Sequence, residues 1–151
     1  MSTAKQIHDL YRQDLFKWCH ENSKLLSKKK FDLIDIENLV EEIRSMGAQE
    51  QDKLESFFVI LFLHILKLKY QPDYDYGIRG WKLSVKEHRK RIKKHLKKNP
   101  SLKGCFAEIT KDSYEYARLE AARETGLKEE IFPKRMPFTL EEALADDWYP
   151  S

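Results

Sequence analysis

The stretch FFVILFLHILKLKY, residues 57–70, decides the fold. It is apolar on every side of a helical projection, and its length and β-branched content do not by themselves separate a buried strand from a buried helix. The flanking residues favour a helix, because they are helix-forming and contain no turn signal before Gln71-Pro72, which ends it. A helix that is apolar all round belongs at the centre of a bundle. We therefore expect burial of Phe58, Leu61, Phe62, Ile65 and Leu66.

Two amphipathic helices are predicted before this central segment. Residues 7–26 carry an apolar stripe at the 3.6-residue period, and the lysines of residues 28–30 follow it with a charge that suits a helix C-terminus. Asp35 is placed to cap the next helix. The apolar face of that helix consists of Ile36, Leu39, Val40, Ile43 and Met46. Gly47 either ends this helix or kinks it.

The C-terminal half predicts two more helices and a tail. Residues 71–80 are expected to form an exposed turn, followed by a helix over 81–98 and another over 101–125. The stripe of the first of these helices is Trp81, Val85, Ile92 and Leu96. Gly126 suits a left-handed cap after the second. The tail, residues 128–151, is predicted to be extended and to end in a short helix, with Thr139 and Glu142 as its capping box.

Length and composition agree with this scheme. The chain has 151 residues, 41% of them hydrophobic and 12% aromatic, which is enough for one packed core. Only five glycines and five prolines are present, too few for a sandwich or barrel of many short strands. We expect a compact all-α bundle of about five helices, forming a single domain over residues 1–151 with the tail packed on it.

The sequence also indicates a compartment. The N-terminus has no apolar signal core, and the longest uncharged apolar run, residues 57–66, is about half of what a membrane span needs. Cys19 and Cys105 form no CxxC pair and suit a reducing environment. These features predict a cytoplasmic protein that does not enter the membrane.

Positive charge is concentrated in one segment. Residues 79–98 hold ten Lys and Arg against one acidic residue, whereas the rest of the chain holds eighteen against twenty-four. A regular array of lysines projects from the predicted helix: Lys82, Lys86, Lys90, Lys93, Lys94 and Lys97. Such a face suits nucleic-acid phosphates, and it is equally ordinary for a solvated helix.

Known catalytic and cofactor motifs are absent from the sequence. There is no Glu-x-x-His, no glycine-rich phosphate loop and no nucleophile elbow. His88 and His95 lie about 10.5 Å apart along a helix, so they cannot share one ion directly. We therefore expect no metal and no cofactor, and the sequence favours a protein that is not an enzyme.

Three polar residues interrupt apolar faces. Asp14 falls on the stripe of residues 7–26, His64 lies in the central helix, and Arg89 borders the stripe of the basic helix. Burial of an unpaired charge is costly, so we expect Asp14 to pair with Arg89 or His64, either directly or through water. Such a cluster either fixes helix register or forms a small anionic-ligand or acid–base site.

Several segments, in order along the chain, carry a family resemblance. They include YRQDLFKW (11–18), FDLIDIENLVEEIRSMG (31–47), LHILKLKYQP (63–72), WKLSVKEHRKRI (81–92), NPSLK (99–103), ARLEAARETGL (117–127) and the ending PFTLEEALADDWYP (137–150). By these residues the chain resembles the bacterial family called domain of unknown function 29. The resemblance implies an all-helical fold and brings no established activity. Leu68 departs from the family pattern, because related sequences often have Trp after the lysine at this position. We interpret the change as one hydrophobic core residue replacing another.

Three functional interpretations follow from the sequence. The first is a helical protein, monomer or homodimer, that binds an unidentified protein partner without catalysing a reaction. The second is nucleic-acid binding through the basic helix. The third is an enzyme or ligand binder that uses Asp14, His64 and Arg89.

Overall fold

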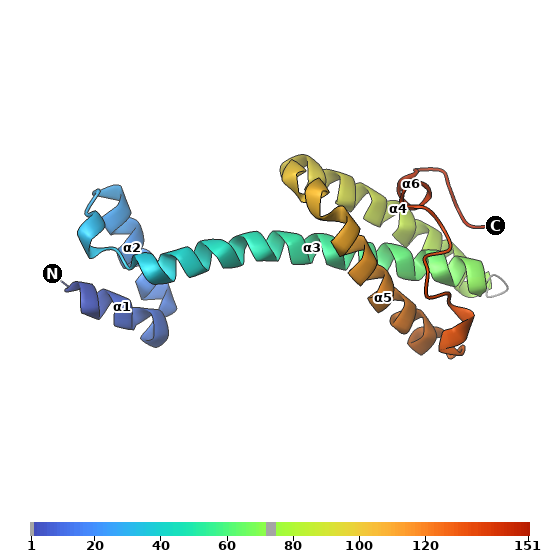
Figure 1. Ribbon diagram of the computed structural model, residues 1–151, viewed down its shortest axis with the longest axis horizontal. Helices are drawn as coiled ribbons and strands as arrows, with labels where there is room; N and C mark the ends of the chain where they lie inside the picture. The colour runs from blue at the N-terminus through green and yellow to red at the C-terminus, as the bar shows by residue number, and fades with distance from the viewer. Residues whose placement is uncertain (1, 72–74) are drawn as a thin grey trace. The chain divides into compact units, whose positions relative to one another are not determined.

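Helix-forming residues occupy most of the chain, and the computed structural model is all-α (Figure 1). The structure describes residues 2–71 and 75–151, without the side chains of residues 75 and 76. No β-strand occurs within these residues, which confirms the predicted fold class. Residues 72–74, part of the expected turn, lie outside the described residues.

The chain gathers into two compact units, Met1–Ala48 and Gln49–Ser151. The first contains helices α1 (Ala4–Gln13) and α2 (Leu15–Ser27) and the short 3₁₀ helix η1 (Phe31–Leu33). Helix α3 (Ile36–Tyr70) begins in this unit and ends in the second. The expectation of a single domain over residues 1–151 stays a prediction.

The expected helix over residues 7–26 is two helices. Asp14 has φ −157° and ψ 86°, which no helix accommodates, and it ends α1. Its carboxylate accepts a hydrogen bond from the Lys17 backbone N–H at 3.0 Å and so starts α2. The prediction missed the break because aspartate is both a tolerated helix residue and a strong N-cap.

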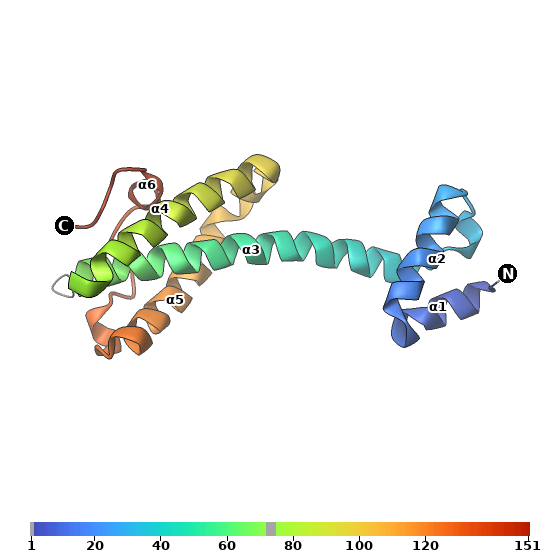
Figure 2. The ribbon, with the colours of Figure 1, turned by 180° about the vertical axis from the view of Figure 1, so that it is seen from behind.

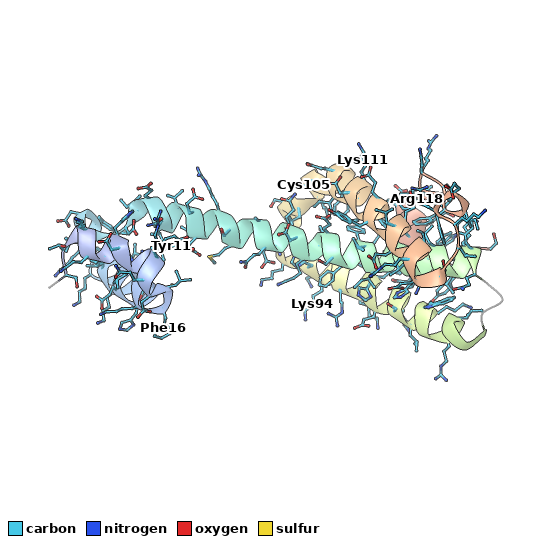
Figure 3. All side chains as sticks on the ribbon, turned by 90° about the horizontal axis from the view of Figure 1, so that it is seen from below. Tyr11, Phe16, Lys94, Cys105, Lys111 and Arg118 are labelled. Carbon is cyan, nitrogen blue, oxygen red and sulfur yellow. The ribbon has the colours of Figure 1, made fainter. Side chains whose placement is uncertain are left out.

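Gly47, which was expected either to end its helix or to kink it, does not end it. α3 runs through Gly47 because residues 48–56 are good helix formers without proline, and one glycine costs a helix only about 1 kcal/mol. On the apolar face expected at the start of this helix, Ile36, Val40, Ile43 and Met46 are exposed. In the first unit, Figure 3 likewise shows Phe16 projecting outward from α2.

The second unit is built around the C-terminal half of α3. Helices α4 (Asp75–Lys98) and α5 (Phe106–Thr125) flank this half, as Figure 2 shows. The five residues predicted to be buried, Phe58, Leu61, Phe62, Ile65 and Leu66, are fully buried. Leu68, where the family resemblance departs, is also buried, which agrees with a core position.

The ends of the helices in this unit follow the expected signals in part. α4 begins at Asp75, within the segment predicted as a turn. Residues Pro100–Cys105 form a 3₁₀ helix, η2, so α5 starts later than expected. Gly126 has φ 72° and caps α5 in the left-handed conformation, as predicted.

The C-terminal tail lies on this bundle. It contains η3 (Glu129–Ile131) and the short helix α6 (Leu140–Leu144), whose Thr139–Glu142 capping box is present as predicted. The Tyr114 hydroxyl donates a hydrogen bond to the Pro133 carbonyl, and Arg118 Nε donates one to the Phe132 carbonyl at 2.6 Å. Phe132, Phe138 and Ala143 are buried. The tail thereby completes the hydrophobic core.

No helix in the described ranges 2–71 and 75–151 is both long enough and apolar enough to span a membrane.

Candidate functional site

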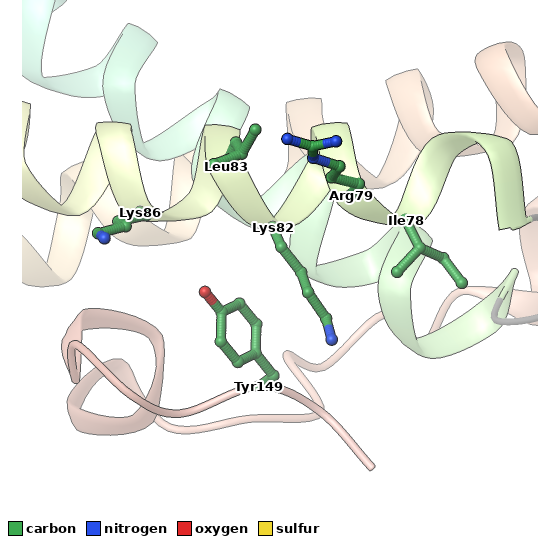
Figure 4. Close-up of a pocket in the computed structure, with 6 residues that line it drawn as sticks. All are labelled: Ile78, Arg79, Lys82, Leu83, Lys86 and Tyr149. Atoms are coloured by element: carbon green, nitrogen blue, oxygen red, sulfur yellow. The ribbon is translucent and has the colours of Figure 1, made fainter.

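A groove lies between α4 and the C-terminal tail (Figure 4). It encloses about 390 Å³ and is lined by Ile78, Arg79, Lys82, Leu83, Lys86 and Tyr149. The Lys82 ammonium lies 5.3 Å from the centre of the Tyr149 ring, a cation–π contact that Figure 4 displays. The groove thus combines an apolar surface with three cationic side chains.

Arg89 holds the tail against α4. The tail in turn forms one wall of the groove through Tyr149. The side chain of Arg89 is 1% exposed. Nε donates to the Ala143 carbonyl at 2.7 Å, and Nη2 donates to the Trp148 carbonyl at 2.6 Å. Longer bonds of 3.4 Å reach the carbonyls of Glu142 and Asp146. Burial lowers the pKa of this guanidinium, while Tyr149 and Asp146 oppose the change. Arg89 is therefore a structural clamp on the tail backbone.

The six predicted lysines of α4, Lys82, Lys86, Lys90, Lys93, Lys94 and Lys97, are all exposed. Lys93 Nζ lies 2.6 Å from Asp146 Oδ1, and this hydrogen bond lowers the pKa of Asp146. The tail therefore places a carboxylate on the basic face. The role of these lysines in nucleic-acid binding stays a prediction.

His64 is partly buried in the second unit and lacks a partner at one ring nitrogen. Among the described residues, its Nδ1 has no hydrogen-bond partner. Burial lowers the pKa of His64 to about 4, and the nearby Lys67 adds to this effect. The imidazole is consequently neutral at pH 7 and cannot act as a cationic partner for a carboxylate.

The expected burial of Asp14 is wrong. Its side chain is exposed and serves as the N-cap of α2 in the first unit. An exposed cap does not need an ionic partner, so the reason for expecting a pair with Arg89 or His64 is removed. A site that unites Asp14, His64 and Arg89 stays a prediction. The hydrogen bonds of Arg89 to the tail and the neutral state of His64 give it no support.

A different carboxylate, Asp35, organises the first unit. It was predicted as a cap, which the 3.4 Å bond from the Asn38 backbone N–H supports. Asp35 is also buried, and it accepts hydrogen bonds from Trp18 Nε1 at 2.8 Å and from Asn38 Nδ2 at 2.7 Å. His8 Nδ1 lies 3.0 Å from its other oxygen. These bonds connect α1, α2 and α3 through one side chain.

Electrostatics strengthen the contact between His8 and Asp35. Burial raises the pKa of Asp35, but the hydrogen bonds from Asn38, Trp18 and His8 outweigh burial and lower it overall. The hydrogen bond and charge of Asp35 raise the pKa of His8. Sequence reasoning missed this network because its contacts cross 17 and 27 residues and leave no periodic signal.

A cavity of about 400 Å³ borders His8. It is lined by His8, Asp9, Tyr11, Arg12, Gln13, Glu37 and Asn38. Because Arg12 is cationic and both Asp9 and Glu37 are acidic, the lining selects neither an anion nor a cation. The Tyr11 hydroxyl is already occupied, since it donates to Glu42 Oε1 at 2.6 Å. The lining of this cavity therefore indicates no particular class of ligand, whereas the groove beside Tyr149 is uniformly cationic and apolar.

Metal-binding chemistry has no support in the described part of the chain, where no group of three His, Cys, Asp or Glu side chains could hold an ion. Cys19 and Cys105 are free thiols. The residues that the geometry singles out are thus those of the cationic groove and of the Asp35 network.

Comparison with known proteins places the chain in a family. A search of curated proteins and a search of solved structures both found no match. The family model described as "Domain of unknown function DUF29" matches residues 10–149, nearly the whole chain. The extent of that match agrees with the helices, caps and tail described above, and the protein belongs to the DUF29 family.

Proposed function

We propose that this protein is a non-enzymatic interaction protein whose groove between α4 and the tail binds an acidic, amphipathic segment of a partner protein. The observation that carries the proposal is the lining of the groove. Apolar atoms of Ile78, Leu83 and Tyr149 lie beside the cationic groups of Arg79, Lys82 and Lys86. A segment with leucine-like side chains flanked by Asp or Glu complements both features.

The exposure of Leu83 supports the choice of an amphipathic partner. This side chain is more than half exposed although it lies beside the partly buried Tyr149 and Ile78. Burial of a leucine by a partner contributes about 1.5–3 kcal/mol. A ligand that binds only through charge, such as a phosphate backbone, would not bury Leu83 and would not gain this free energy.

Nucleic-acid binding is the second candidate, favoured by the exposure of all six lysines along α4. Phosphates would contact the whole face, whereas a peptide in the groove needs only the lysines at its edge. The position of Asp146 next to Lys93 weighs against phosphates, because a carboxylate there repels them. Nucleic-acid binding therefore depends on all six lysines, whereas peptide binding depends only on Lys82 and Lys86.

A binding experiment separates these candidates. Three probes are titrated against the full chain: a synthetic helical peptide with a leucine face flanked by glutamates, polyglutamate, and duplex DNA. We expect the amphipathic peptide to bind more tightly than polyglutamate. Absence of peptide binding at low salt, or equal binding of polyglutamate, contradicts the proposal.

Two matched double variants locate the binding surface. K82E/K86E reverses charge at the groove, and K90E/K97E makes the same change on the same helix outside it. Peptide binding should fall at least about tenfold in the first variant and change little in the second. L83S should weaken peptide binding without affecting DNA. Similar losses of DNA binding in both double variants, with no peptide binding, would support the nucleic-acid candidate.

A further inference from the structure

The N-terminal part of α3 exposes a continuous apolar stripe. Ile36, Val40, Ile43 and Met46 are 59%, 39%, 60% and 64% exposed. Their spacing of three and four residues places them along one side of the helix, near the open backbone of Gly47. Four large apolar side chains in one row differ from the scattered exposed hydrophobics of an ordinary surface.

This stripe is separate from the side of α3 that holds the first unit together. Asn38 and Glu42 are the residues of α3 that bond to Asp35 and Tyr11, respectively. At 100° per residue they lie roughly opposite Ile36, Val40 and Ile43. The α1 and α2 helices are therefore secured through another face, and the stripe is available to a partner.

We propose that this stripe binds the same stripe of a second copy, with the two α3 segments antiparallel. An axis between residues 41 and 42 sets Val40 against Ile43 of the second copy, and Ile43 against its Val40. The same axis sets Ile36 against Gly47, where an added Cβ would meet nothing within 4 Å. Ile36 thus faces a position with room for its side chain, as a knob needs a hole on the facing helix.

The residues beside the stripe match in the same arrangement. Glu37 and Arg44 flank the stripe on one side, and with this axis Glu37 of one copy lies within two residues, about 3 Å along the helix, of Arg44 of the other, close enough for an ion pair. On the other side, Met46 lies at the same offset from Leu39 of the second copy, which is partly buried. Within one copy Arg44 contacts Glu41 at 3.3 Å, an exposed pair that is weak enough to exchange. On each side of the stripe, the residues of one copy therefore match those of the other: Glu37 with Arg44 by charge, and Leu39 with Met46 by apolar contact.

The predicted dimer is weak and depends on concentration, because the stripe covers only about three helical turns. The test uses the full chain alone, measured by sedimentation velocity over a dilution series. We expect a monomer–dimer equilibrium. I43E, which places a charge on an exposed position of the stripe, should raise the dissociation constant at least tenfold while circular dichroism shows an unchanged fold.

A charge exchange tests the antiparallel alignment. E37R and R44E should each weaken association, because each places like charges opposite one another, and E37R/R44E should restore it. D52R makes the same kind of change at an exposed position of α3 outside the contact and should leave association unchanged. A protein that stays monomeric at every concentration, a dimer insensitive to I43E, or a double exchange that fails to restore association would overturn the proposal.

This inference is independent of the partner-binding groove. K82E/K86E, which tests the groove, should not change self-association. The two proposals can therefore fail separately.

Discussion

His64 and Arg89 are both polar side chains among apolar neighbours, but the protein accommodates them in opposite ways. Arg89 remains charged because several backbone carbonyls accept its hydrogen bonds. His64 has an unpaired Nδ1 among the described residues, and it avoids the cost of burying a charge by remaining neutral. Their sequence context, an apolar helical stripe, does not distinguish these outcomes.

His64 makes stability sensitive to acid. Its pKa is about 4 in the folded protein and 6.5 in the unfolded chain, so the unfolded chain binds more protons between these values. Stability is therefore complete above pH 6.5 and falls as the pH decreases toward 4. H64L should flatten this part of the profile and should not destabilise the protein at pH 7. Urea unfolding at several pH values measures the effect.

A matched control for this prediction is H20L, which removes a histidine from an exposed position. It should preserve the slope of the wild-type profile between pH 6.5 and pH 4. Parallel profiles for H64L and the wild type would contradict the assignment of this acid sensitivity to His64.

At the scale of the elements, local signals predicted well which segments are helical. They did not predict which apolar helix faces are covered by other elements. The central segment was identified correctly because it is apolar all round, and Gly126 and Thr139 act through local geometry. The stripe at Ile36 and Val40 was identified as an apolar face, but amphipathicity does not show what covers such a face, and both residues are exposed. The position of the tail depends on long-range hydrogen bonds from Arg89 and Arg118, which no local sequence pattern reveals.

The boundary between α1 and α2 depends on a single cap. D14A should destabilise the first unit by about 1 kcal/mol, the usual loss for an N-cap, and not by the larger amount expected for a broken buried ion pair. D14S keeps a capping oxygen and should recover most of the loss. Thermal unfolding measures both variants. A loss of 3 kcal/mol or more for D14A would point to the buried pair.

The candidate groove exists only at the scale of the assembled second unit. Its lysines come from α4, but Tyr149 comes from the tail, more than fifty residues later. The spacing of the lysines predicted an outward basic face, which the sequence left open as either a phosphate-binding surface or an ordinary solvated one. It could not predict that Tyr149 joins Ile78 and Leu83 of α4, because that depends on where Arg89 fixes the tail.

Removal of the Arg89 clamp should release the tail. R89M retains the apolar stem but loses the bonds to the tail carbonyls, and unsatisfied buried carbonyls cost about 1–3 kcal/mol each. We expect faster hydrogen exchange and faster proteolysis in residues 140–151, together with loss of binding in the groove.

R91M provides the control for this change. Arg91 is an exposed neighbour that pairs with Glu87, and its replacement should leave the protection of the tail unchanged. Equal protection of the tail in R89M and the wild type would show that the clamp is dispensable.

The clamp has an evolutionary consequence. Arg89 contacts carbonyl oxygens, which every amino acid possesses, so these hydrogen bonds do not depend on which side chains residues 142, 146 and 148 carry. Side chains such as Asp146 can therefore drift in sequence while the tail keeps its path. Only the packed positions, such as Ala143, are constrained by shape. Substitutions at such exposed positions therefore change the charge around this groove without altering the backbone that forms it.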